Sequence, residues 1–220
     1  MLDRFHPPVE EYLETIFSLD EEGVPVIQAR LAERLDKAAP SVSEMLDRLA
    51  ADDLITRDGR LISLTPSGRA VAESVARKHR LAERLLVDII GLDWEKAHLE
   101  AGRWEHVISD EVEARLVELL GNPSTCPHGN PIPGAPATGV PQRCLADVDV
   151  GDDVVLARIT EGVEHDAASL SYLGQHGLTP GARALVRSRA PDGTLTLLVG
   201  DDAVAVGPDM TRRLFVAAAT

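Results

Sequence analysis

The sequence predicts a mainly α-helical protein with a small β domain. Apolar residues recur at helical spacing over most of the first half of the chain. A stretch dense in Pro and Gly follows, and the chain then changes to short β-like runs. We therefore divide it into a winged helix-turn-helix at residues 1–72, a helical domain at 73–122, a linker at 123–143 and an SH3-like β-barrel at 144–220.

Residues 1–72 contain the signals of three helices and one β-hairpin. Helical spacing predicts helices at residues 8–19, 27–35 and 40–54. Asp58 and Gly59 form a two-residue turn signal between two β-like runs. Two short helices joined by a brief turn and followed by a hairpin are typical of a winged helix-turn-helix, with the hairpin as the wing.

The helical domain is delimited by residues that start and stop helices. These signals predict three helices, at residues 66–90, 93–107 and 110–120. Thr65 and Ser109 precede the first and third helices as caps, and Gly91 and Gly121 end them. The segment 122–142 has too much Pro and Gly for a helix or a central strand, which makes it a linker.

The C-terminal domain is predicted from short strands and regular turns. Four β-like runs and one helix-like stretch occur there, at residues 154–159, 182–186, 195–199 and 203–206, and at 167–175. Strands of this length and spacing indicate a small barrel of the SH3-like type.

A DNA-binding surface is predicted on the third helix and the wing. The outer face of this helix, where a recognition helix presents groups to base edges, carries Ser41, Ser43, Glu44 and Arg48. Arg57 and Arg60 flank the wing turn, where they could meet a phosphate or the minor groove. A solvated helix face with ordinary surface arginines is the alternative, because few basic residues lie nearby.

The net charge, the apolar runs and the cysteine content restrict the classes of function. A formal charge of -14 argues against constitutive DNA binding, because Lys and Arg supply most of the non-specific affinity for phosphates. It permits a switch in which divalent cations remove part of the negative charge. The chain has no apolar run of about 18 residues and no signal-peptide pattern, so we expect a cytoplasmic protein without membrane contact. Cys126 and Cys144 are too few for a disulfide framework.

Histidine and glutamate residues share helix faces in the middle domain. The predicted helix 93–107 carries one stripe, formed by His98, Gly102, Glu105 and His106. On the preceding helix, His79 and Glu83 are four residues apart. Imidazole and carboxylate groups on rigid helices suit a first-row divalent ion. His98 and His106 would lie about 12 Å apart along one helix, too far to share an ion, so two metal sites per subunit are predicted.

Three stretches of sequence carry a family resemblance. They are RKHRLAERLLVDIIGL at residues 77–92, RWEHVISDEVEARLV at 103–117 and HGNPIPG at 128–134. Together they resemble the diphtheria toxin repressor family of iron- and manganese-dependent regulators. The resemblance implies a homodimer with a helical dimerisation domain and a FeoA-like C-terminal domain. It also implies that metal sets the two winged domains to the spacing of a palindromic operator in double-stranded DNA.

The resemblance further implies two sets of metal ligands. The ancillary set would comprise His79, Glu83 and His98, completed from the SH3-like domain by Glu161 and Glu164. The primary, regulatory set would comprise Glu11, Glu105, His106 and the main-chain carbonyl of Gly102.

Two positions of the primary set depart from the iron-responsive branch of this family. That branch has a methionine where this chain has Glu11 and a cysteine where it has Gly102. A carboxylate in place of sulfur makes the site harder, which favours Mn(II) over softer or later metals. Glu14 resembles a carboxylate ligand of the manganese-responsive branch, although that branch has a glutamate in place of Gly102. Cys126 resembles a primary-site ligand of some manganese-responsive members, and it is either such a ligand or a structural thiol.

The sequence therefore predicts a metal-activated repressor of metal-uptake genes and not an enzyme. Mn(II) is the predicted corepressor, with Fe(II) as the alternative. Two other classes stay open at this point. A metalloenzyme could use paired His and carboxylate sites, although the chain has no HExxH motif. A metal-independent winged-helix regulator would use the same His/Glu stripe only as part of its core.

Overall fold

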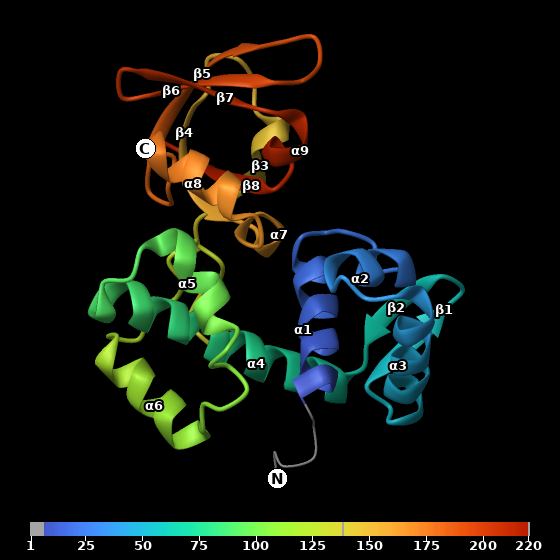
Figure 1. Cartoon of the computed structure of the whole chain (residues 1–220). Helices are drawn as coiled ribbons and strands as arrows, with labels where there is room; N and C mark the ends of the chain where they lie inside the picture. The colour runs from blue at the N-terminus through green and yellow to red at the C-terminus, as the bar shows by residue number, and fades with distance from the viewer. Residues whose placement is uncertain (1–6, 138, 220) are drawn as a thin grey trace.

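The computed structural model of the chain describes residues 7–137 and 139–219. Residues 1–6, where the predicted first domain begins, lie outside the described part. Figure 1 shows three lobes: a winged lobe and a helical lobe side by side, connected by the long helix α4, and a β lobe above them. The predicted fold class, mainly α with a small β domain, is confirmed.

The winged lobe contains three helices and a two-stranded hairpin: α1 (Pro7–Glu21), α2 (Gln28–Arg34), α3 (Ala39–Ala51), β1 (Ile55–Asp58) and β2 (Leu61–Leu64). Its helices bury Leu13, Leu31 and Leu46 in one common core. The predicted Asp-Gly turn joins the strands, since Asp58 pairs with Leu61 and Gly59 takes a φ of +58°. Burial of leucines from all three helices orients α3 and the wing relative to α1.

The helical lobe is built from α4 (Pro66–Arg84), α5 (Trp94–Ala101) and α6 (Asp110–Leu119). Thr65 caps α4 by accepting a hydrogen bond from the Gly68 N–H, and Ser109 caps α6 in the same way. Helix α4 continues as a π-helical segment, Leu85–Ile90, until Gly91 ends it with a left-handed φ of 78°. Within the described residues, no helix is long and apolar enough to cross a membrane.

One predicted helix is shorter than its apolar pattern indicates. The helix expected at residues 93–107 ends at Ala101, and consecutive turns follow. The Trp104 N–H bonds to the Ala101 carbonyl three residues back, so the α-helical hydrogen-bond ladder is interrupted just after Gly102. Glu105 and His106 therefore lie on a turn that bends toward α1, and not on the helix that carries His98.

The β lobe is a six-stranded antiparallel sheet with the strand order β3-β8-β4-β5-β6-β7. Its strands are β3 (Arg143–Cys144), β4 (Asp153–Ile159), β5 (Arg183–Arg189), β6 (Leu195–Val199), β7 (Asp202–Val206) and β8 (Leu214–Ala218). Three short helices connect them: α7 (Glu161–Glu164), α8 (Ala167–Gln175) and α9 (Pro208–Thr211). The sequence prediction missed β3 and β8, because apolar runs this short do not distinguish a strand from other buried segments.

The Pro/Gly-rich segment is packed against strand β4. The Ile159 N–H donates to the carbonyl of His128, and the Asn130 side chain donates to the carbonyl of Ile159. Gly129 has a φ of +88°, and a Cβ atom at this position would lie 2.0 Å from the carbonyl oxygen of Ala157. A side chain at residue 129 would therefore separate the segment from the barrel.

Replacement of Gly129 by Ala is expected to destabilise the metal-free chain by about 1–3 kcal/mol more than replacement of Gly139. Gly139 is a matched control, because its φ is +69° but a Cβ there would meet nothing within 4 Å. Thermal melting of both variants in chelator tests this, and equal losses of stability would contradict the close approach at residue 129.

Candidate metal centre

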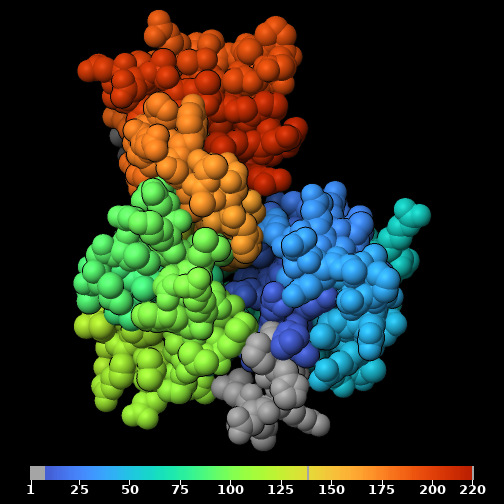
Figure 2. All heavy atoms as spheres, in the orientation of Figure 1, coloured from blue at the N-terminus to red at the C-terminus, as the bar shows by residue number. Residues whose placement is uncertain are grey.

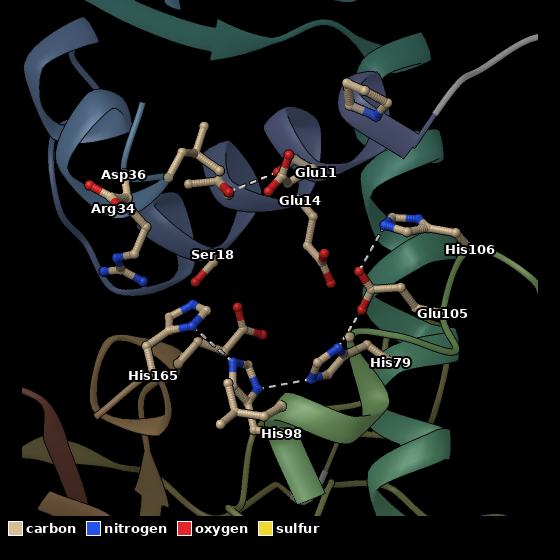
Figure 3. Close-up of a pocket in the computed structure, with 16 residues that line it drawn as sticks. Glu11, Glu14, Ser18, Arg34, Asp36, His79, His98, Glu105, His106 and His165 are labelled. Atoms are coloured by element: carbon tan, nitrogen blue, oxygen red, sulfur yellow. Dashed lines mark hydrogen bonds and ion pairs between the residues drawn. The ribbon is translucent and has the colours of Figure 1, made fainter. Parts of the chain in front are cut away.

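A cavity of about 490 Å³ lies where the three lobes meet (Figure 3). Helix α1 contributes Glu11 and Glu14, and the turn after α5 contributes Gly102, Glu105 and His106. The remaining predicted ligands on its wall are His79 from α4, His98 from α5 and Glu161 from α7. All the residues predicted for the primary set except Cys126 thus line a single cavity.

Glu105 connects two histidines on the wall of this cavity. One of its carboxylate oxygens meets Nδ1 of His79, and the other lies 3.1 Å from Nε2 of His106. The second nitrogen of His106 lies 2.6 Å from Glu10, which the sequence analysis did not single out. Ligand atoms of Glu14, His79 and Glu105 lie within 4.8 Å of one another. Burial, and then the charge of Glu105, raise the pKa of Glu14 well above its usual value.

A second group of ligand atoms is buried behind the first. Atoms of His79, Glu83, His98 and Glu164 lie within 4.8 Å of one another. One oxygen of Glu83, Oε1, is 3.1 Å from Nε2 of His79 and 3.2 Å from Nδ1 of His98. Glu83 is fully buried and Glu164 is 2% exposed. The i,i+4 spacing of His79 and Glu83 on α4 sets half of this group, and the packing of α5 and α7 supplies the rest.

The structure places Cys126 next to the second group, with which its own neighbours share Glu83. Its thiol joins Glu83 and His128, with ligand atoms within 4.8 Å of one another. Nδ1 of His128 lies 3.3 Å from both Glu83 Oε1 and Glu164 Oε2. His128 was missed by the sequence analysis, and the signal that could have found it is a cysteine and a histidine two residues apart in a chain with only two cysteines. Burial, and then the charge of Glu83, raise the pKa of the Cys126 thiol.

Glu161 and Glu164 have different partners. Glu164 lies in the buried group, with Oε2 3.0 Å from Nδ1 of His98. Glu161 accepts a hydrogen bond from Arg80 at 2.7 Å. Although burial by itself raises the pKa of Glu161, the Arg80 guanidinium lowers it to about 2. Glu161 is thus the partner of an arginine in this structure, even though it also borders the cavity.

The chemistry of the buried group fits a divalent cation. Two side-chain atoms there make no hydrogen bond among the described residues: Oε2 of Glu83 and Nδ1 of His128. Buried polar atoms are nearly always paired, so carboxylates and imidazoles that approach to 3.3 Å without hydrogen-bonding are arranged as a ligand set would be.

Metal binding to this group is expected to depend on pH. Burial alone lowers the pKa of His98, but the carboxylates of Glu164 and Glu83, which accept from its ring N–H, raise it to about 10 in the metal-free protein. A metal ion binds imidazole only after the proton has left, and the pKa of His79 in the same group is raised as well, so the Mn(II) affinity should rise at least about tenfold per pH unit near neutrality. Competition with a fluorescent chelator at several pH values measures this slope, and His98→Gln should make it less steep. An affinity that does not change with pH would contradict the prediction.

The residues predicted to contact DNA lie on α3 and the wing. Ser41, Glu44 and Arg48 are exposed on α3, and Ser43 is partly buried. Arg57 and Arg60 are exposed on either side of the wing turn, and Arg57 lies 2.9 Å from Asp47 of α3. In Figure 2 the wing projects from the right-hand edge of the winged lobe.

Comparison with known proteins decides the family. Residues 4–60 match the family described as "Iron dependent repressor, N-terminal DNA binding domain", residues 65–134 match its "metal binding and dimerisation domain", and residues 143–218 match the FeoA domain. The chain is 44% identical to the iron-dependent repressor IdeR of Mycobacterium tuberculosis, covering 94% of this chain and 95% of that protein. The chain belongs to the iron-dependent repressor family. It is a metal-dependent, DNA-binding repressor of the diphtheria toxin repressor type, as its sequence motifs predict.

Other relatives of this repressor include both iron- and manganese-dependent proteins. The diphtheria toxin repressor of Corynebacterium efficiens is 54% identical to it, covering 78% of this chain and 79% of that protein. A solved structure described as a manganese-dependent transcriptional repressor in complex with manganese has 31% identity and a TM-score of 0.87, covering 96% of this chain and all of that one. The crystal structure of T. acidophilum IdeR has 28% identity and a TM-score of 0.79, covering 96% of this chain and 97% of that one.

Proposed function

We propose that this protein is a cytoplasmic repressor that is activated by Mn(II) and controls genes of metal uptake. Fe(II) is the second candidate for the activating metal. The observation that carries the choice of metal is the donor set of the cavity between α1 and the turn after α5. Its side-chain donors are the carboxylates of Glu11, Glu14 and Glu105 and the imidazole of His106, and Gly102 also lines this cavity. Oxygen and imidazole donors without sulfur favour Mn(II) over softer metals.

The positions of these ligands suggest how metal and DNA binding are coupled. Glu11 and Glu14 belong to the winged lobe, whereas Glu105 and His106 belong to the helical lobe. A bound divalent ion supplies positive charge among carboxylates that otherwise repel one another. Glu11 and Glu14 then hold α1 against the turn after α5, and α1 in turn orients α3 and the wing. Operator binding must raise metal affinity by the same factor as metal raises operator affinity.

We assign the second metal site of each subunit to the buried group of His79, Glu83, His98 and Glu164. The oxygen Oε2 of Glu83, which makes no hydrogen bond, supports this assignment. The thiol of Cys126 beside Glu83 makes this group softer than the cavity in front of it. An Fe(II) role is therefore better supported here than at the primary set, and the similarity to the iron-dependent repressor IdeR makes Fe(II) the alternative corepressor.

The helical lobe also supports a homodimer on a palindromic operator. Large apolar side chains are exposed on and between its helices, at Ile89, Ile90, Leu99, Val107, Val112 and Leu119. Exposed apolar groups of this kind mark a protein interface, and a twofold dimer presents two winged lobes to two half-sites. We assign contacts with DNA to Ser41, Ser43, Glu44 and Arg48 on α3 and to Arg57 and Arg60 at the wing.

The experiment that tests the proposal is anaerobic fluorescence anisotropy of a palindromic operator selected with this protein. Mn(II), Fe(II) and Zn(II) are titrated separately, with a chelator control. Binding that requires metal, and that appears at lower free Mn(II) than Fe(II), is the expected result. Half-saturation at lower free Fe(II) would make iron the corepressor, and binding in excess chelator would overturn metal activation.

A further inference from the structure

His165 lies beside the metal-ligand candidate His98, on the side opposite the buried carboxylates. Nδ1 of His98 faces Glu164 at 3.0 Å and Glu83 at 3.2 Å, whereas its Nε2 lies 3.2 Å from Nδ1 of His165. The two rings meet edge to face, with centroids 4.5 Å apart at 80°. Figure 3 shows His165 at the edge of the cavity, with its ring directed at His98.

This arrangement restricts which nitrogen of His98 can bind a metal ion. An imidazole ligand coordinates through one ring nitrogen and carries its proton on the other, and an acceptor for that proton fixes both the tautomer and the ring orientation. Nδ1 of His98 points into the ligand group, so Nε2 must carry the proton. Among the described residues, the hydrogen-bond acceptor at Nε2 is Nδ1 of His165.

We propose that His165 is a positioning residue for the buried metal site: it accepts the Nε2–H of His98 and so keeps His98 Nδ1 free to coordinate. The inference rests on the proposed function, because it concerns the ligand set of the second metal site. It goes beyond that function in naming a residue outside the ligand set that determines how tightly the set binds.

The position of His165 makes it a second contribution of the β lobe to this site. His165 directly follows α7, and its N–H bonds to the carbonyl of Glu161. The same short helix ends with Glu164, which faces the other nitrogen of His98. Both nitrogens of His98 are therefore contacted from one segment of the barrel. Figure 2 shows the segment that begins with α7 wedged between the helical and winged lobes.

The test compares His165→Leu, which removes the acceptor, with His165→Asn, which keeps an oxygen acceptor near the former Nδ1. His165 is exposed and borders a second cavity of about 450 Å³, so both side chains can be accommodated without repacking a core. His176→Leu is the control, because His176 lies at the end of α8 of the same lobe and meets the ring of Tyr172 edge to face. Melting of the metal-free variants checks that each one folds.

Mn(II) binding to the full chain is measured by EPR in competition with a chelator. His165→Leu should lower the Mn(II) affinity of one of the two sites about 10-fold. This is the lower end of the loss in metal affinity that follows removal of a partner that orients a ligand. His165→Asn should recover most of this loss, and His176→Leu should bind like the wild type. Unchanged affinity in His165→Leu, or no recovery in His165→Asn, would overturn the positioning role.

A spectroscopic measurement identifies the proton itself. In the Co(II) form, the Nε2–H of His98 should give a hyperfine-shifted NMR signal that disappears in D₂O and exchanges faster in His165→Leu than in the wild type. Equal exchange rates would count against the hydrogen bond. If the wild-type chain binds no metal at this group, the second site of the proposed function fails; if it binds and His165→Leu binds equally, only the role of His165 fails.

Discussion

Glu105→Gln is expected to abolish metal-dependent operator binding. The carboxylate of Glu105 meets His79 with one oxygen and His106 with the other, and it lies with Glu14 in one ligand group. The amide keeps the volume but removes the charge that a hard cation requires. Loss of a residue that only orients a ligand already lowers metal affinity about 10- to 100-fold. Loss of Glu105, a proposed ligand itself, should therefore lower operator affinity at a given free Mn(II) concentration by about 100-fold or more.

Glu118→Gln is the matched control for this variant. Glu118 lies on α6 with 68% of its side chain exposed, and its partner is the equally exposed Arg115. The control should bind operator with the metal dependence of the wild type, and light scattering should give the same mass for both variants. Full metal-dependent binding by Glu105→Gln would remove Glu105 from the primary set.

Arg80→Met is expected to lower the free energy of unfolding more than any other substitution considered above. Arg80 is 1% exposed, and its guanidinium bonds to Glu21 of α1, to Glu161 of α7 and to the carbonyl of Pro131. One side chain thus holds the winged lobe, the Pro/Gly-rich segment and the barrel together. Its removal leaves Glu161 buried without its counter-charge, which in buried ion pairs costs about 3–5 kcal/mol.

Urea denaturation in excess chelator measures this loss without a contribution from metal binding. Arg115→Met is the control, because its ion pair with Glu118 is exposed on both sides and should contribute less than about 1 kcal/mol. A loss below about 1 kcal/mol in Arg80→Met would show that the three contacts do not stabilise the assembly of the lobes.

Much of the fold could be predicted because its signals are local. Thr65 and Ser109 cap the helices that the sequence assigned to them, and Asp58 with Gly59 forms the expected hairpin turn. The errors occur where local signals compete or are weak. The apolar pattern continues beyond Gly102, but three-residue turns replace the helix there. Strand β8 is a short run that pairs with β3 and β4, which are distant in sequence.

In the candidate site, too, local spacing predicted some neighbours and the packing of distant segments decided the others. The sequence by itself determined that His79 and Glu83 share a face of α4, because an i,i+4 spacing on a helix brings two side chains together whatever surrounds it. It also determined that the residues at positions 11 and 102 carry no sulfur.

Only the tertiary structure decided which distant residues meet these ligands. Glu164 faces His98 while Glu161, three residues earlier, pairs with Arg80; Cys126 joins His128 beside Glu83; and His165 meets the far nitrogen of His98. Helical geometry places a residue relative to its own turn, but the distance between ligands on α4, α5, α7 and the Pro/Gly-rich segment is set by how three lobes pack. That packing depends on contacts such as those of Arg80, which span up to 81 residues of sequence and leave no local pattern.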